Sequence, residues 1–307
     1  MKKYRVFTTK EVPEVALKLL RKQGYKILVG GNPNKKAQGV EAVLCLLTDR
    51  VDGKLMDAIG PQLKIISNCA VGLDNIDVAA AKKRGIVVTN TPDVLTQAVA
   101  EYTIALLFSR ARRVAEADRF MRTGKFKGWE PQLFLGSDIS QKTLGIVGLG
   151  RIGVEVARRM HDGFSLKILY YDVKRNQKLE KEFGLEYRSL HALLRESDFV
   201  SLHVPLLSST RHLIGTREFK EMKKTAYLIN TARGAVIDEK ALVFALKTNM
   251  IKGAALDVFE NEPKLSPGLA KLQNVLLTPH IASATEETRD AMAELAAKNI
   301  IMVLENL

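Results

Sequence analysis

Three ionisable residues follow apolar, strand-like runs in the last third of the chain. Arg233 comes after "YLIN", Glu262 after "GAALDV", and His280 ends "NVLLTPH". In doubly wound α/β sheets, ligands bind beyond the carboxyl ends of the strands, so the three side chains are expected to meet there. An arginine can hold a carboxylate with two parallel hydrogen bonds. A histidine bonded to a glutamate can donate a proton, because the carboxylate fixes its tautomer and stabilises the imidazolium.

Each of the three has another interpretation when it is taken alone. An arginine after a strand is often a surface salt-bridge partner, a loop glutamate is usually solvated, and a lone histidine is more often structural than catalytic. Their common position at strand ends favours the interpretation as one site. The chemistry that such a set supports is acid–base chemistry on an anionic carbonyl compound.

A glycine-rich turn, Gly148-Leu149-Gly150-Arg151-Ile152-Gly153, directly follows the apolar run "TLGIV" and begins the helical pattern "IGVEVARRM". The first glycine permits the tight turn, the second lets the backbone approach a pyrophosphate, and the third lets helix and strand pack closely. The N–H groups at the helix N-terminus can bind the anion. The strand and helix on either side argue against a turn that binds no ligand.

An acidic residue stands where the adenosine ribose of a dinucleotide would need a hydrogen-bond acceptor. Asp172 ends "ILYYD", nineteen residues after Gly153, which is the expected spacing. A carboxylate there suits NAD and repels the 2′-phosphate of NADP, although Lys174 and Arg175 follow closely and leave NADP open. We expect NAD(H) as the cofactor. Beside a nicotinamide, the arginine, glutamate and histidine are suited to hydride transfer.

Apolar, β-branched runs alternate with helical patterns along the chain. Strands are predicted at 4–9, 26–30, 42–47, 64–69 and 86–90, and again at 142–148, 167–172, 198–204, 226–230, 253–258 and 274–280. Strict alternation predicts parallel, doubly wound sheets with helices on both faces. Long helices are expected from about 94 to 113, from there to about 123, and over 285–305. The stretch 125–138 is rich in glycine, proline and aromatic residues and is predicted to be an arm or linker.

The composition is that of an ordinary globular protein, with 307 residues, 46% of them hydrophobic and 26% charged. The sequence has no run of eighteen apolar residues, which a membrane span would need. The first residues also lack the apolar stretch of a secretory signal. The two cysteines, Cys45 and Cys69, are far apart and indicate buried thiols in a reducing compartment, with no disulfide and no metal site. We therefore expect a cytoplasmic protein.

The formal net charge of +13 raises the question of a nucleic-acid partner. The basic residues come in twos and threes spread through the helices, and no zinc-finger or RNA-binding signature accompanies them. The charge is therefore interpreted as a solvated basic surface, which also attracts small anionic ligands. We expect no nucleic-acid partner.

Five motifs carry a resemblance to a known family: "GLGRIG", "HVPL" (203–206), "NTARGAVIDEKAL" (230–242), "ALDVFENEP" (255–263) and "TPHIAS". With them the chain resembles the D-isomer-specific 2-hydroxyacid dehydrogenases over essentially its whole length. The resemblance implies an α/β fold of two doubly wound parallel-sheet domains. These are a flavodoxin-like substrate domain at 1–95 plus 286–307 and a Rossmann NAD-binding domain at 96–285, with a dimerisation arm at about 96–140.

The resemblance also implies the roles of individual residues. Arg233, Glu262 and His280 become the substrate-binding and acid–base residues, and the backbone N–H groups of Val71 and Gly72 hold the substrate carboxylate. The residues expected to line the cofactor, besides the glycine-rich turn and Asp172, are His203, Val204, Pro205, Thr210, Thr231, Ala232 and Asp257. Simple strand-end roles for His203 and Asp257, and a purely geometric role for Gly72, are the alternatives.

The segments "VTNTPDVLTQAVAEYTIALL" and "GRIGVEVARRM" are most similar to the glyoxylate and hydroxypyruvate reductases. The expected function is NAD(P)H-dependent reduction of a small 2-keto acid to the D-2-hydroxy acid by a homodimer. Trp129, the only tryptophan, either reaches the neighbouring subunit's active site or anchors the dimer.

Two alternatives stay open. Phosphite dehydrogenases share "DRVD" and "GWEPQ"-like segments, but they are expected to need a lysine where this chain has Val71. A corepressor-like protein that senses NAD(H) could keep the arginine, glutamate and histidine, but such relatives carry extended tails. Turnover of a 2-keto acid would separate the enzyme from the sensor.

Overall fold

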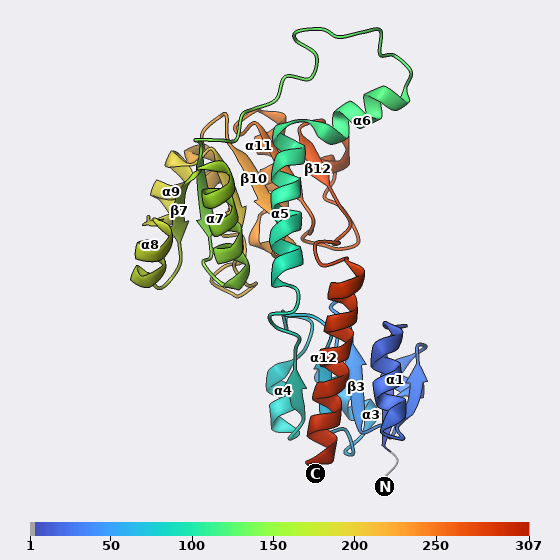
Figure 1. The fold of residues 1–307 in the computed structure, drawn as a ribbon. Coiled ribbons are helices and arrows are strands. Elements are labelled where there is room, and N and C mark those ends of the chain that lie inside the picture. Colours follow the sequence, from blue (N-terminus) through green and yellow to red (C-terminus); the bar gives the residue numbers. More distant parts are fainter. Residues whose placement is uncertain (1–3, 307) are drawn as a thin grey trace. The chain divides into compact units, whose positions relative to one another are not determined.

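The computed structural model describes residues 4–306. Residues 1–3 and 307, the two ends of the predicted substrate domain, lie outside the described residues. The chain divides into two compact units, one of Met1–Leu95 and Ser283–Leu307 and the other of Thr96–Ala282. The chain therefore leaves the first unit, builds the whole of the second, and returns to the first for its last helix (Figure 1).

The first unit is built on a five-stranded parallel sheet with the strand order β2-β1-β3-β4-β5, the order of flavodoxin-like sheets. Its strands are β1 (Arg5–Thr8), β2 (Lys26–Val29), β3 (Ala42–Cys45), β4 (Ile65–Asn68) and β5 (Val87–Thr89). Its helices are α1 (Glu14–Lys22), α2 (Pro33–Lys36), α3 (Gly53–Ile59), α4 (Val78–Lys83) and α12 (Glu286–Glu305).

Helix α12 belongs to the first unit although the second unit precedes it in the chain. It packs against α1 and β4, and Ser67 Oγ of β4 donates a hydrogen bond to the Ala296 carbonyl oxygen at 3.0 Å. The opposite face of the sheet buries Phe7, Val43 and Ile66 in one cluster with residues of α3. Both faces of the sheet are covered, as its continuous apolar strands require.

The second unit is built on a seven-stranded parallel sheet with the order β12-β11-β10-β9-β6-β7-β8, which is a Rossmann order extended by one strand. Its strands are β6 (Thr143–Val147), β7 (Lys167–Tyr171), β8 (Glu186–Tyr187), β9 (Phe199–Leu202), β10 (Tyr227–Asn230), β11 (Gly253–Leu256) and β12 (Val275–Leu277). Its helices are α5 (Thr96–Ala111), α6 (Val114–Arg122), α7 (Arg151–Phe164), α8 (Gln177–Phe183), α9 (Leu190–Glu196), α10 (Thr216–Glu221) and α11 (Glu239–Lys247), with short 3-10 turns at Gly234–Val236 and Leu269–Lys271.

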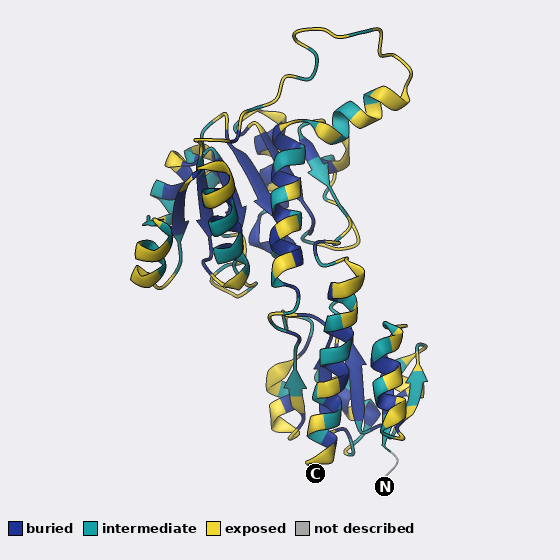
Figure 2. Cartoon of the chain, viewed as in Figure 1, coloured by how far each residue is buried: buried dark blue, intermediate teal, exposed yellow. Residues whose placement is uncertain are grey.

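Alternate residues of these strands enter two separate cores. Ile146 and Ile229 pack on the side of α5 and α7, whereas Val147 and Leu228 pack on the side of α9, α10 and α11. The alternation follows from the period of two along a strand. The central strands are therefore buried on both faces (Figure 2).

The fold class predicted from the sequence is confirmed: both units are α/β with parallel sheets. One strand of the second sheet, β8, is not among the predicted strands, because two residues are too few for a period to be visible. Residues 125–138 contain no helix or strand, and Trp129 within them is 84% exposed. No helix within residues 4–306 is long and apolar enough to cross a membrane.

Candidate active site

The glycine-rich turn joins β6 to α7 and leaves room for an anion. Gly148 has a φ of +97°, and a Cβ atom there would lie 2.8 Å from the His203 carbonyl carbon. A Cβ on Gly153 would lie 2.2 Å from the Gly148 carbonyl oxygen, so both positions require glycine. A Cβ on Gly150, by contrast, would meet no atom within 4 Å. Gly150 is the N-cap residue of α7 and provides no side-chain cap, so the turn fits a bound pyrophosphate.

Asp172 follows β7 and faces this turn. Its Oδ2 atom accepts a hydrogen bond from the Leu149 N–H at 2.7 Å. The carboxylate is therefore placed beside the glycine-rich backbone, as a ribose-binding acid should be.

The segment after β9 lies against the same turn. His203 N–H donates to the Val147 carbonyl oxygen at 2.7 Å, and Nε2 lies 2.8 Å from Ser201 Oγ. Burial of the imidazole ring lowers the pKa of His203 to about 4, although part of the residue remains exposed. Further along the same segment, Thr210 Oγ1 donates to the Pro205 carbonyl oxygen at 2.6 Å and accepts from the Leu207 N–H at 2.8 Å. The segment after β9 therefore presents a neutral imidazole and a loop that hydrogen bonds hold in place.

Arg233 stands in a loop that β10 and a buried asparagine orient. Asn230 is fully buried, and its side chain accepts from Ala232 N–H at 3.0 Å and donates to the Arg233 carbonyl oxygen at 2.9 Å. Thr231 Oγ1 lies 2.8 Å from Thr103 Oγ1 of α5. Asn230 is a positioning residue that the sequence analysis missed; its place at the end of a buried strand was the available signal.

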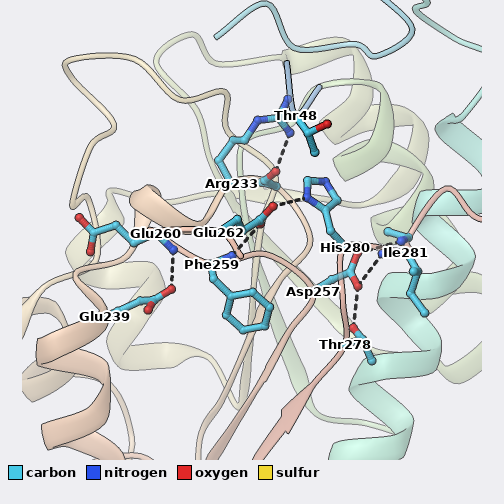
Figure 3. A network of polar contacts seen from close by, with 12 residues as sticks. Thr48, Arg233, Glu239, Asp257, Phe259, Glu260, Glu262, Thr278, His280 and Ile281 are labelled. Carbon is cyan, nitrogen blue, oxygen red and sulfur yellow. Dashed lines mark hydrogen bonds and ion pairs between the residues drawn. The ribbon is translucent and has the colours of Figure 1, made fainter. Parts of the chain in front are cut away.

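A glycine brings the Arg233 loop against the loop of Glu262. A Cβ on Gly234 would lie 1.8 Å from the Phe259 carbonyl carbon, so only glycine permits this approach. The Glu262 loop has a second anchor in Glu239, whose buried carboxylate accepts from the Glu260 N–H at 2.5 Å (Figure 3). Two loops that begin on neighbouring strands are thus held side by side.

Glu262 and His280 form the central pair of the site. His280 Nδ1 lies 2.9 Å from Glu262 Oε2, and Glu262 Oε1 accepts from the Phe259 N–H at 2.9 Å (Figure 3). Burial alone would raise the pKa of Glu262, but hydrogen bonds from His280 and Phe259, together with the charge of Arg233, hold it below the usual value. Glu262 is therefore an anion at neutral pH, and it occupies one ring nitrogen of His280.

His280 has an unusual backbone conformation, and Asp257 maintains it. The φ of His280 is +56°, in the left-handed region that non-glycine residues seldom occupy. Asp257 is fully buried. Its carboxylate accepts from the N–H groups of Ile281 at 2.9 Å and Ala282 at 2.8 Å and from Thr278 Oγ1 at 2.6 Å. Asp257 therefore holds the backbone that follows His280 and the side chain of Thr278 before it, a role that the sequence analysis did not predict.

Val71 and Gly72 lie in a loop of the first unit after β4. Asn90 Nδ2 donates to the Val71 carbonyl oxygen at 2.7 Å, and Asn68 Nδ2 donates to the Gly72 carbonyl oxygen at 2.8 Å. Asn75 braces the same loop with donations to the carbonyl oxygens of Leu46 and Asp49 at 3.0 Å each. The Val71 carbonyl shares its peptide group with the Gly72 N–H, and the Ala70 carbonyl, which accepts from the Thr91 N–H at 3.0 Å, shares its peptide group with the Val71 N–H. The orientation of both N–H groups is therefore fixed.

The nucleotide turn and the Glu262–His280 pair therefore lie at one edge of one sheet, beyond the carboxyl ends of β6, β11 and β12. In residues 4–306, no group of three or more histidine, cysteine or acidic side chains could hold a metal ion. A Rossmann sheet with these two features at its ligand-binding edge defines a class of protein, the oxidoreductases that use a dinucleotide cofactor.

Comparison with known proteins identifies the family within this class. The model of the "D-isomer specific 2-hydroxyacid dehydrogenase, NAD binding domain" matches residues 104–282. A glyoxylate reductase of Thermococcus litoralis is 51% identical over 97% of this chain and 93% of its own length. The chain belongs to the D-isomer specific 2-hydroxyacid dehydrogenase family, and it is an oxidoreductase that uses NAD or NADP.

Solved structures agree with this assignment. The crystal structure of a Thermus thermophilus protein matches with a TM-score of 0.92 and 42% identity, covering 98% of this chain and 97% of that one. An NADPH-dependent glyoxylate/hydroxypyruvate reductase of Sinorhizobium meliloti, in complex with NADP and malonate, matches with a TM-score of 0.89 and 34% identity, covering 98% and 93%. The similarity thus extends over both units.

Proposed function

We propose that the protein reduces a small 2-keto acid, of the glyoxylate or hydroxypyruvate type, to the D-2-hydroxy acid with NADH. The observation that carries this proposal is the 2.9 Å contact between His280 Nδ1 and Glu262 at the sheet edge that bears the nucleotide turn. The names of the Thermococcus and Sinorhizobium relatives support this substrate class.

His280 is the proton donor in this proposal. Because Nδ1 faces Glu262, Nε2 is the ring nitrogen that gives its proton to the carbonyl oxygen. The nicotinamide, when bound, supplies the hydride that the carbonyl carbon receives. Glu262 stabilises the imidazolium before transfer and the Nδ1–H tautomer after it. Arg233 binds the substrate carboxylate through two parallel hydrogen bonds.

The loop of Val71 and Gly72 offers backbone N–H groups to the same carboxylate. The fixed orientation of its peptide groups supports this role, since preorganised donors bind an anion without reordering. Position 71 also bears on the phosphite alternative. A valine there offers no cation to a doubly charged anion, so a monoanionic keto acid is the better match.

The residues proposed to hold the cofactor are the turn Gly148–Gly153 with Leu149, Gly150, Arg151 and Ile152, then Asp172, His203, Val204, Pro205, Thr210, Thr231 and Ala232. Asp257, also expected to line the cofactor, is fully buried and its carboxylate accepts three hydrogen bonds from the loop of His280, so we propose that it positions this loop instead. The open space at Gly150 and the placement of Asp172 beside Leu149 support the phosphate and ribose positions. The carboxylate of Asp172 favours NAD over NADP.

We further propose a homodimer in the cytoplasm. The segment from α6 through residue 135 exposes large apolar side chains, with Met121, Trp129 and Leu135 each more than half exposed. Several exposed large apolar side chains in one segment support a protein–protein interface there. Two buried, unpaired cysteines suit a reducing compartment. In light scattering the wild type should have twice the mass of one chain, and Trp129→Ala with Leu135→Ser should shift it toward one. A monomeric wild type would refute the dimer.

The function is tested by a panel of glyoxylate, hydroxypyruvate and pyruvate with NADH and NADPH, and of phosphite with NAD and NADP. Steady-state turnover of a keto acid, with chiral analysis identifying the D-product, supports the proposal. The matched control is His280→Asn, which keeps the size and polarity of the side chain. Turnover of phosphite alone would favour the dehydrogenase alternative, and NADH binding without any turnover would favour the sensor.

A further inference from the structure

The arginine closest in sequence to the ribose-binding acid is engaged by another side chain. Arg175 Nε donates to Glu180 Oε1 at 2.8 Å, and Nη2 donates to Oε2 at 2.7 Å. This is a two-point ion pair that uses the fork of the guanidinium. The guanidinium carbon also lies over the ring of Tyr187 in β8, 5.9 Å from its centre. Arg175 therefore has a defined place between α8 and β8.

The carboxylate that holds Arg175 is itself held firmly. Tyr170 is fully buried, and its hydroxyl donates to Glu180 Oε1 at 2.6 Å while accepting from the Asn176 N–H at 2.8 Å. Asn176 caps α8 through the Leu179 N–H at 3.2 Å. The bonds from Arg175 and Tyr170 lower the pKa of Glu180 to about 2. Glu180 is therefore ionised at any working pH and cannot turn away without breaking these bonds.

The ion pair between Arg175 and Glu180 matters because Arg175 lies close to Asp172 in the sequence. In Rossmann domains the acid after the second strand bonds the ribose 2′-hydroxyl of NAD, and an arginine nearby accommodates the 2′-phosphate of NADP. This chain has both residues within four positions, Asp172 and Arg175. Glu180 occupies the Nε–Nη2 edge of the guanidinium and compensates its charge, so this two-point edge is not available to a second anion. Lys174 presents a single ammonium group and does not replace a fork.

We propose that Glu180 is a positioning residue that sets the cofactor preference, by withholding Arg175 from the 2′-phosphate and so favouring NADH over NADPH. This inference rests on the proposed function only in requiring a nicotinamide dinucleotide at the glycine-rich turn. To use this two-point edge, a 2′-phosphate would have to displace an ordered carboxylate from both donors while approaching the carboxylate of Asp172. NADH carries no such group and leaves the ion pair intact.

The test measures the Kd of NADH and NADPH by calorimetry, without keto acid, so that it does not depend on turnover. Glu180→Ala should tighten NADPH binding about tenfold and leave NADH within about twofold, since it frees one charge-assisted pair. Glu182→Ala is the matched control, because it removes the same charge from an exposed position of the same helix. Glu182→Ala should leave the ratio of the Kd values for NADPH and NADH unchanged. Arg175→Ala combined with Glu180→Ala should restore the wild-type ratio.

Three results would overturn the inference. The first is an unchanged ratio in folded Glu180→Ala, and the second is a gain that persists in the double variant. The third is an equal gain in Glu182→Ala, which would indicate general electrostatics. If Glu180→Ala does not fold, Glu180→Gln and the single variant Arg175→Ala decide the question. Arg175→Ala should not weaken NADPH binding, and a tenfold loss would mean that Arg175 already binds the phosphate. A wild type that binds neither cofactor would instead refute the proposed function.

Discussion

Asp257→Asn tests whether a buried carboxylate positions the catalytic histidine. The side chain accepts three hydrogen bonds, from Thr278 Oγ1 and from the N–H groups of Ile281 and Ala282. Asparagine keeps one oxygen, so the bonds to Oδ1 weaken and the bond from Ala282 to Oδ2 is replaced by two opposed donors. A hydrogen bond to a charged group contributes about 1.5–3 kcal/mol. We expect the free energy of unfolding to fall by about 2–4 kcal/mol, which a domain of ordinary stability tolerates.

The functional effect follows from the backbone of His280. Its φ of +56° costs about 1–3 kcal/mol and persists only where the surroundings impose it. Without the Ala282 bond the loop should relax, and a displacement of about 1 Å at a reacting group costs roughly a hundredfold in rate. We expect kcat for keto-acid reduction to fall about a hundredfold, with the Kd of NADH within about threefold of the wild type.

The assay combines urea unfolding, steady-state oxidation of NADH and calorimetric NADH binding. Thr278→Val is the matched control, because it removes one bond to Asp257 that does not involve the loop backbone. It should cost about 1.5–3 kcal/mol and change kcat less than about threefold. The reasoning fails if Asp257→Asn keeps the wild-type kcat. A large loss of NADH affinity with little change in kcat would assign Asp257 to the cofactor instead.

The other predictions concern residues that contact His280 or the substrate loop. His280→Asn should lower kcat by about two to four orders of magnitude while NADH still binds, and near-wild-type turnover would exclude it as the proton donor. Glu262→Gln should move the alkaline limb of the pH–rate profile of reduction to lower pH, because the imidazolium loses its carboxylate partner; an unmoved limb would leave Glu262 another role. Asn90→Ala frees the Val71 carbonyl and should raise KM for the keto acid about tenfold with the Kd of NADH unchanged. An equal loss of cofactor affinity would contradict a role confined to the substrate loop.

Much of the fold could be predicted because its signals are local. Each buried strand is a short apolar run between helical patterns, and the tight turn at 148–153 needs glycine for reasons that concern adjacent residues only. The predicted strand 274–280 ends as β12 at Leu277, close to Pro279, which cannot donate to a neighbouring strand. The strand β8, with two residues, has no period and could be recognised only from its pairing with β7.

The candidate catalytic residues were visible for the same reason. Arg233, Glu262 and His280 follow strands of one parallel sheet, and parallel strands present their carboxyl ends at one edge, so position along the sequence was enough to expect them together. The 2.9 Å contact between Glu262 and His280 agrees with that expectation.

What the sequence by itself determined, then, is the alternation of strand and helix, the nucleotide turn and the ionisable residues at one sheet edge. Only the tertiary structure decided which polar group each of those residues meets. Asp257 holds residues more than twenty positions away, Asn90 reaches back to Val71, and Arg175 pairs with Glu180 although Asp172 is nearer in sequence. The physical reason is that a hydrogen bond or ion pair depends on angles and distances of an ångström or less, and competing partners are separated only when the backbone that carries them has been folded.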